Sequence, residues 1–248
     1  MKKLSYLSIG LLLVFCAFSL KKETPVIYMI GDSTMANKEE KAKPETGWGQ
    51  VLNRFFTDEI KIDNRAQNGR SSKSFIGEKR WDNILSTLKK GDYVIIQFGH
   101  NDAKADSSRH TDPQTTFKAN LVKFINDTRA KGAFPILCTS IVRRHFDAKG
   151  QLTDTHGEYV KVPRQVAAEM NVPLIDMEAK TRKLIANLGP EESKKLYLFA
   201  QPGEYPNRPK GVEDSTHLKE EGALKFAALA VNGMKELNLP LVKFLKNN

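Results

Sequence analysis

Short, almost continuously apolar runs recur along this chain, with longer amphipathic stretches between them. The five runs cover residues 26–30, 60–63, 93–98, 134–140 and 172–175. Continuous apolar runs of this length are typical of parallel strands that are covered on both faces, whereas a strand with one solvent face alternates apolar and polar residues. The pattern therefore predicts five buried, parallel strands.

The stretches between the runs have the apolar spacing of helices. They cover residues 48–56, 81–88, 117–130, 158–170, 177–188 and 219–237. Asp112 and Pro113, just before the third stretch, read as a helix cap followed by a proline in the first turn. Repeated strand–helix–strand units with right-handed crossovers build an open, doubly wound parallel sheet. We therefore expect one α/β domain over residues 24–248.

The N-terminus has the features of an export signal. Two lysines precede the apolar stretch 9–18, which is shorter than the about 20 residues that span a bilayer. Ala17 and Ser19 place small residues at the two positions that a signal peptidase recognises, so we expect cleavage after Ser19. We expect residues 1–19 to be a signal peptide, no stable membrane span, and a periplasmic or extracellular protein. A lipid anchor on Cys16 and an uncleaved membrane anchor are the alternatives.

The charge balance favours an anionic partner. The chain has 39 Lys and Arg against 29 Asp and Glu, a net charge of +10, and loss of Lys2 and Lys3 with the leader would leave +8. An acidic polysaccharide, a nucleic acid or an anionic membrane would each suit this excess. Because the basic residues are scattered and no P-loop or GxGxxG motif occurs, we expect neither nucleic-acid nor nucleotide binding. The sequence carries no signal for an oligomeric state.

The cysteines and histidines do not suggest a metal centre. Only Cys16, in the leader, and Cys138, inside an apolar run, are present, so the mature protein should have no internal disulfide. No CxxC pair or HExxH spacing occurs. We expect no metal and no organic cofactor.

Polar, glycine-rich segments follow the apolar runs. They are residues 31–34, 64–72, 99–102 and 143–145, and a fifth segment, 214–217, precedes the last helix. In doubly wound sheets, ligands bind outside the carboxyl ends of the strands. These segments are therefore expected to meet on one rim of the sheet.

Three residues in these segments have the chemistry of a catalytic triad. A serine hydroxyl needs a base within hydrogen-bond reach, and His217 can serve Ser33 in that role. Asp214, three residues earlier on the same expected turn, can accept the Nδ1–H of His217 and fix its tautomer. Taken alone, a serine directly after a strand is most often a cap or turn residue, and Asp214 and His217 could be a capping residue and a surface histidine. Their presence on one expected rim favours nucleophilic catalysis.

The same rim offers donors for a developing oxyanion. The Gly69 N–H can approach a ligand closely because glycine has no side chain. The side-chain amide of Asn101 and the N–H of Ser33 are further donors. An ordinary turn glycine and a strand-end asparagine are the alternative interpretations of the first two.

Four blocks carry a resemblance to a known family. They are Gly31-Asp32-Ser33-Thr34, Gly69, Gly99-His100-Asn101-Asp102 and Asp214-Ser215-Thr216-His217. They resemble the four sequence blocks of the SGNH (GDSL-like) hydrolase superfamily, in the same order. The resemblance implies a three-layer α/β/α sandwich with a flavodoxin-like, five-stranded parallel sheet. It also implies that Ser33 is the nucleophile, His217 the base and Asp214 its partner, with Ser33, Gly69 and Asn101 as the oxyanion hole.

Finer features resemble the rhamnogalacturonan acetylesterase branch of that superfamily. These are Thr34, Gly47-Trp48-Gly49, Asn68-Gly69-Arg70-Ser71-Ser72 and Gln97-Phe98-Gly99-His100-Asn101-Asp102. The resemblance implies an esterase that removes O-acetyl groups from acidic plant polysaccharide, with rhamnogalacturonan of pectin as the favoured substrate.

Five further residues are candidates for substrate contact. Arg70, Arg143 and Arg144 could bind a uronate carboxylate, since arginine binds carboxylates in a bidentate manner. His145 follows the last two, and His100 stands beside Asn101. Solvation at the surface and, for His100, packing at the strand end are the alternatives.

The sequence thus predicts an exported serine esterase that works through an acetyl-enzyme on an acetylated acidic polysaccharide. The same residues would also serve an acetylesterase acting on xylan or another glycan, or a lipid or thioester hydrolase. A non-catalytic carbohydrate-binding module is the alternative from another class. That alternative predicts the loss of the nucleophile or the base, and both are present.

Overall fold

Five parallel strands form the central sheet of the computed structural model, which describes residues 24–247. They are β1 (Val26–Gly31), β2 (Lys61–Asn64), β3 (Tyr93–Gln97), β4 (Phe134–Cys138) and β5 (Leu174–Ile175), in the order β2-β1-β3-β4-β5. The predicted parallel sheet is confirmed, with strand ends that differ from the apolar runs by one or two residues. The signal peptide expected at 1–19, with Cys16, lies outside the described residues.

Helices connect the strands. They are η1 (Glu40–Ala42), η2 (Trp48–Phe55), α1 (Ser72–Gly77), α2 (Arg80–Leu85), η3 (Pro113–Phe117), α3 (Lys118–Ala130), α4 (Glu158–Met170), α5 (Met177–Glu192), η4 (Ser193–Lys195), α6 (Glu220–Glu236) and η5 (Pro240–Phe244). The stretch predicted as a helix at 48–56 is a 3-10 helix, and the short helix α1 was not predicted. Within residues 24–247, no helix combines the length and apolarity needed to cross a bilayer.

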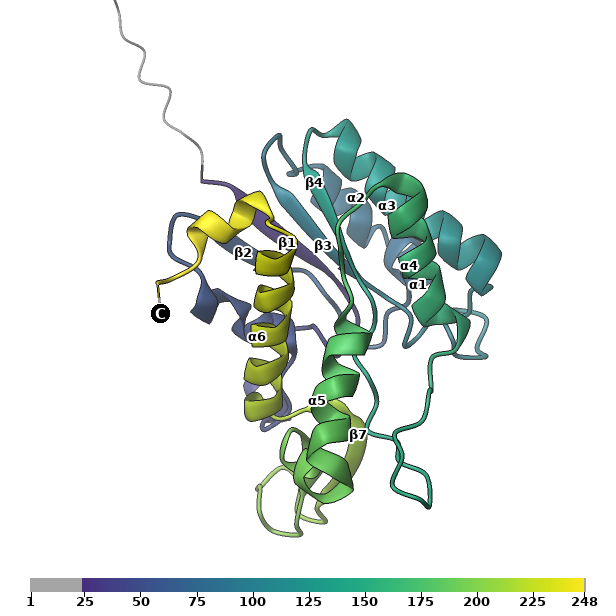
Figure 1. Ribbon diagram of the computed structural model, residues 1–248, viewed down its shortest axis with the longest axis vertical. Helices are drawn as coiled ribbons and strands as arrows, with labels where there is room; N and C mark the ends of the chain where they lie inside the picture. Colours follow the sequence, from purple (N-terminus) through teal and green to yellow (C-terminus); the bar gives the residue numbers. More distant parts are fainter. Residues whose placement is uncertain (1–23, 248) are drawn as a thin grey trace, which may run out of the picture.

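The sheet is covered on both faces. In β1, Ile27 and Met29 pack into one apolar cluster with the helices η2, α5 and α6. Tyr28 and Ile30, which point the other way, pack into a second cluster with α1 to α4. Figure 1 shows α5 and α6 together on one side of the sheet and α1 to α4 on the other. The three layers follow from this two-sided burial, in which each large apolar side chain contributes roughly 1.5–3 kcal/mol.

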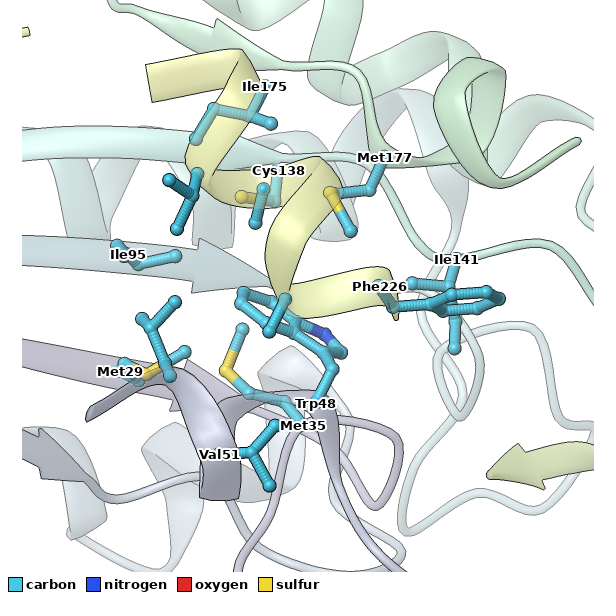
Figure 2. Packing of buried hydrophobic residues seen from close by; sticks show 14 of the residues in the cluster. Met29, Met35, Trp48, Val51, Ile95, Cys138, Ile141, Ile175, Met177 and Phe226 are labelled. Carbon is cyan, nitrogen blue, oxygen red and sulfur yellow. The ribbon is translucent and has the colours of Figure 1, made fainter. Parts of the chain in front are cut away.

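Trp48 connects the core to the edge where the strands end. Its indole is fully buried in the cluster that Figure 2 draws, with Met29 and Ile95 of the strands, Met177 of α5 and Phe226 of α6. The indole N–H donates to Gln97 Oε1 at 3.0 Å, so its one polar group is satisfied. Gln97 is the last residue of β3, and its position is therefore fixed from within the core.

A two-stranded antiparallel hairpin stands apart from the main sheet. Its strands are β6 (Tyr197–Ala200) and β7 (Val212–Leu218), with Leu198 opposite Asp214. The prediction that Asp214 and His217 lie on a turn before the last helix is wrong, because both residues lie within β7. The sequence Val-Glu-Asp-Ser-Thr-His-Leu has no apolar run, so its pairing across the loop 201–211 left no local signal.

Gly222 is expected to show how tightly α6 packs against this hairpin. Replacing Gly by Ala inside an exposed helix normally adds up to about 1 kcal/mol of stability. At Gly222 a Cβ would lie 2.0 Å from the Leu196 carbonyl oxygen, so α6 would have to move away. We expect Gly222→Ala to lower the free energy of unfolding by about 1–3 kcal/mol in urea denaturation.

Gly77→Ala is the matched control, because no heavy atom lies within 4 Å of a Cβ built at the end of α1. This variant should unfold at the same or a higher urea concentration. Equal stability of the two variants would contradict the packing of α6 against Leu196.

Candidate active site

Ser33, His217 and Asp214 form one hydrogen-bonded line. Ser33 lies on the turn that follows β1, and the other two residues lie in β7. The distance from Ser33 Oγ to His217 Nε2 is 2.8 Å, and that from His217 Nδ1 to Asp214 Oδ2 is 2.7 Å. Because an ionised carboxylate only accepts hydrogen bonds, Nδ1 carries the proton and Nε2 accepts from the hydroxyl. The arrangement can therefore draw the proton from Ser33 toward His217.

The Asp214 carboxylate is held by donors from its own strand. Its Oδ1 accepts from the N–H of Thr216 at 2.7 Å and from the N–H of His217 at 3.0 Å. Partial burial raises the pKa of Asp214, but the hydrogen bond and charge of His217 and these two N–H groups outweigh it and hold the pKa well below its ordinary value. Asp214 is therefore ionised at neutral pH and orients the imidazole.

The turn that carries Ser33 is fixed by Asp32 and Thr34. Asp32 is buried, and its Oδ1 accepts from the N–H of Thr34 at 2.9 Å and from the Thr34 hydroxyl at 2.8 Å. Burial raises the pKa of Asp32, but the charge and hydrogen bond of His100, together with Thr34, lower it to about 2. Thr34 Oγ1 in turn accepts from Gln97 Nε2 at 2.9 Å. A continuous chain of hydrogen bonds thus connects Trp48 in the core to the turn of Ser33.

The three expected oxyanion donors lie on segments that are bonded to one another. The loop before Gly69 is attached to the end of β1 through the Gln67 N–H and the Gly31 carbonyl, at 3.0 Å. Gly69 has φ +74° and open space where a side chain would stand. Asn101 Nδ2 donates to the Arg70 carbonyl at 3.1 Å, which leaves its second N–H available.

Across the described part of the chain, the backbone N–H groups of Ser33 and Gly69 have no protein acceptor. Both donors are therefore available to a ligand that lies beside the hydroxyl.

Asp102 supports this rim as a structural carboxylate. It accepts from the N–H and hydroxyl of Ser72, the N–H of Gly99 and the hydroxyl of Thr111. Burial raises the pKa of Asp102 to about 6, and the hydrogen bonds from Ser72 and Thr111 offset only part of that effect. The side chain joins the start of α1 to the segment that carries Asn101.

Two of the candidate arginines are bound within the protein. Arg143 donates to the Thr155 carbonyl at 3.0 Å and to the His100 carbonyl at 3.2 Å. Arg144 lies over the Phe199 ring, with its guanidinium carbon 4.8 Å from the ring centroid, and donates to groups at the end of α5. Burial lowers the pKa of both side chains. These contacts within the protein favour a structural role for Arg143 and Arg144 over contact with a substrate.

The two candidate histidines have opposite surroundings. His100 is 3% exposed, its Nδ1 lies 3.3 Å from Asp32 Oδ2, and its ring packs edge-on against His156 at 4.6 Å. Burial lowers the pKa of His100, and burial together with the charges of His100 and Arg143 lowers that of His156 to about 2. His100 is therefore a packed interior residue just after β3, as in the second of its two interpretations. His145 is exposed, and no residue in 24–247 makes a hydrogen bond with its ring.

Arg70 lies at the mouth of a cavity that begins at Gly69. Its Nε is 3.1 Å from a carboxylate oxygen of Glu78. Lys73 and Arg109 line the same cavity, and neither was predicted from the sequence. Lys73 directly follows the block Asn68-Gly69-Arg70-Ser71-Ser72, and this position is the one sequence signal that could have identified it. Arg109 has no comparable signal.

In the residues that the structure describes, no group of three or more His, Cys, Asp or Glu side chains is arranged so that it could hold a metal ion. Burial strongly raises the pKa of the Cys138 thiol, which fits a small apolar role in the core.

Comparison with known proteins places this geometry in a family. The family model described as GDSL-like Lipase/Acylhydrolase matches residues 29–224. The chain is 42% identical over 222 residues to "Rhamnogalacturonan acetylesterase RhgT" of Bacillus subtilis, covering 90% of this chain and 94% of the relative. It is 38% identical over 218 residues to "Probable rhamnogalacturonan acetylesterase YesY" of the same organism, covering 88% and 95%.

Solved structures show the same fold. The crystal structure of protein YxiM from Bacillus subtilis superposes with a TM-score of 0.76 and 27% identity, and covers 88% of this chain and 58% of that one. Axe2, an acetylxylan esterase from Geobacillus stearothermophilus, superposes with a TM-score of 0.61 over 85% of this chain and 94% of its own. At 17% identity, the latter likeness concerns the fold alone.

Asp214→Asn keeps the imidazole of His217 but removes the carboxylate that orients it, so it tests the orientation alone. An amide at this position favours the wrong tautomer of His217, so we expect kcat on p-nitrophenyl acetate to fall about 10³–10⁴-fold. The KM should change far less, because the substrate does not contact Asp214. A fall of less than tenfold would contradict the role assigned to this carboxylate.

The same variant should alter the acid stability of the protein. The pKa of Asp214 is lower in the folded chain than its ordinary value of 3.8, so its bonds contribute stability above that pH. The contribution is lost as the pH falls below 3.8 toward the folded pKa. We expect the stability difference between wild type and Asp214→Asn, measured by urea denaturation, to shrink from about pH 5 to about pH 2.5. A difference that grows on acidification would contradict the bonding seen here.

Proposed function

This chain belongs to the GDSL-like lipase/acylhydrolase family and is a carboxylic ester hydrolase, and we propose that it is an exported serine esterase that deacetylates rhamnogalacturonan. The hydrogen bond between Ser33 Oγ and His217 Nε2 carries the proposal, because it joins a nucleophile to its base. The names of the relatives from Bacillus subtilis support the substrate. Export is proposed on the sequence of residues 1–19.

The proposed reaction proceeds through an acetyl-enzyme. Ser33 Oγ attacks the acetyl carbonyl carbon while His217 Nε2 takes the hydroxyl proton. Asp214, which stays ionised, stabilises the imidazolium. The tetrahedral oxyanion lies among the N–H groups of Ser33 and Gly69 and the Asn101 amide.

His217 then returns its proton to the sugar oxygen as the C–O bond of the ester breaks. A water molecule attacks the acetyl-enzyme by the reverse relay and releases acetate, which restores the Ser33 hydroxyl. Every proton in this proposed cycle passes through His217 Nε2.

The structure favours this function over the alternatives. A binding module would have no need of a serine hydroxyl bonded to an imidazole that is itself bonded to a carboxylate. The cavity beside Gly69 is lined by charged side chains, which suits a polar glycan better than an acyl chain. An acetylesterase that acts on a neutral glycan would use the same triad, and the choice between glycans depends on residues around it.

Ser33→Ala should abolish acetate release from acetylated rhamnogalacturonan while leaving the far-UV circular dichroism unchanged. We expect a loss of at least about 10³-fold, because the nucleophile is removed and only binding remains. Ser86→Ala, at an exposed serine at the end of α2, is the matched control and should behave as wild type. Equal acetate release by Ser33→Ala and wild type would rule out the proposed function.

Asn101→Ala should test the oxyanion donors separately. Removing one such donor typically costs about 10²–10³-fold in kcat. We expect a loss in that range with little change in KM for p-nitrophenyl acetate. A change confined to KM would assign Asn101 to binding instead.

A further inference from the structure

An open cavity of about 540 Å³ lies directly beside the expected oxyanion hole. Gly69 and Arg70 form its near end, α1 contributes Lys73, and the loop after Asn101 contributes Ser108 and Arg109. Its volume is in the range of small-ligand sites, about 300–1,000 Å³. The triad does not use this space, so the cavity is available to a part of the substrate other than the acetyl group.

The walls of the cavity carry an excess of positive charge. Arg70 and Arg80 share a single carboxylate, Glu78, at 3.1 and 2.6 Å. Arg109 is paired with Asp106 at 2.6 Å. Arg80 and Asp106 are not among the lining residues, so the wall itself carries three cations, Arg70, Lys73 and Arg109, against one carboxylate, Glu78.

Lys73 is the cation whose charge is not balanced. Its Nζ donates to the Ser107 carbonyl at 2.7 Å, and none of the carboxylates in the described part of the chain lies within ion-pair distance. A neutral carbonyl satisfies one N–H and leaves the charge uncompensated. An anionic group in the cavity would therefore gain a charge-assisted hydrogen bond without displacing an existing ion pair.

The cavity and the reacting centre share part of their backbone. Gly69 lines the cavity and is also one of the expected oxyanion donors. The next residue, Arg70, accepts a hydrogen bond from Asn101 through its carbonyl, and Arg70 also lines the cavity. An anion bound here would thus stand beside the sugar whose ester Ser33 attacks.

We propose that this cavity is a subsite for the carboxylate of a uronate residue next to the acetylated sugar, with Lys73 as the decisive contact. The inference rests on the proposed function and deepens it, because it assigns the recognition of an acidic glycan to particular residues. A carboxylate fits the charge present: the ammonium of Lys73 is not compensated, and the guanidinium groups of Arg70 and Arg109, which are paired with Glu78 and Asp106, add positive charge beside it.

The test compares two substrates that differ only in charge. One is an acetylated rhamnogalacturonan oligosaccharide, and the other is the same oligosaccharide with its carboxyl groups reduced to alcohols. Acetate release gives kcat/KM for each, and we expect wild type to prefer the acidic substrate by about 10-fold or more. The preference should fall as NaCl is raised, since the contacts are exposed to solvent.

Lys73→Gln should reduce this preference about 10-fold, and Lys73→Glu should reduce it further. Lys131→Gln is the matched control, because this exposed lysine follows α3 at the opposite edge of the sheet. It should keep the wild-type preference. Lys73 is exposed, so its variants should fold, which circular dichroism will verify.

A binding measurement separates recognition from chemistry. Oligogalacturonate that lacks acetyl groups is titrated calorimetrically into Ser33→Ala and into Ser33→Ala combined with Lys73→Gln. We expect binding at least about 5-fold weaker in the double variant. Equal affinities would overturn the subsite.

The kinetic outcomes distinguish the two claims. Rapid acetate release from both substrates with no preference in wild type would overturn the subsite and leave the esterase intact. Wild type that releases no acetate from either substrate would overturn the proposed function, and the subsite with it. If wild type and Lys73→Glu show the same preference, Lys73 does not bind the carboxylate, and its role in the proposed subsite is overturned.

Discussion

The hydrogen bond from Ser33 to His217 joins two segments that are 184 residues apart, and the function depends on the fold holding both ends still. On one side, the turn of Ser33 is fixed by Asp32 and Thr34, and through Gln97 to the buried indole of Trp48. On the other side, β7 pairs with β6, and α6 packs closely on the segment that leads into β6. The distance across the reacting centre is therefore set by the core and not by the flexibility of two loops.

The charged groups of the rim are held in different ionisation states by their surroundings. Asp32 and Asp214 accept hydrogen bonds that favour their ionised forms, whereas burial dominates at Asp102 and raises its pKa to about 6. Burial lowers the pKa of His100 and His156, whereas His217 has its Nε2 bonded to the Ser33 hydroxyl and is the imidazole placed to exchange protons with a substrate. Three cations, Arg70, Lys73 and Arg109, line the cavity beside Gly69, which none of the three triad residues lines.

The sequence predicts the sheet well because two-sided burial imposes continuous apolar runs, and it places Ser33, Gly69 and Asn101 because each follows such a run. It does not predict β7, whose polar residues pair across a long loop without a local signal. The sequence also does not predict which arginines could contact a substrate, because the partners of a guanidinium group can lie far away along the chain. Arg143 and Arg144 contact groups within the protein, whereas Arg70 and the unpredicted Lys73 line the cavity beside Gly69.

The most direct test of the central claim is covalent labelling with a fluorophosphonate, followed by peptide mass spectrometry. Such a reagent reacts with a serine only when a neighbouring base activates its hydroxyl. The account predicts a single labelled residue, Ser33, and no labelling at this position in His217→Ala. Labelling of a different serine, or labelling of Ser33 at the same rate without the imidazole, would contradict it.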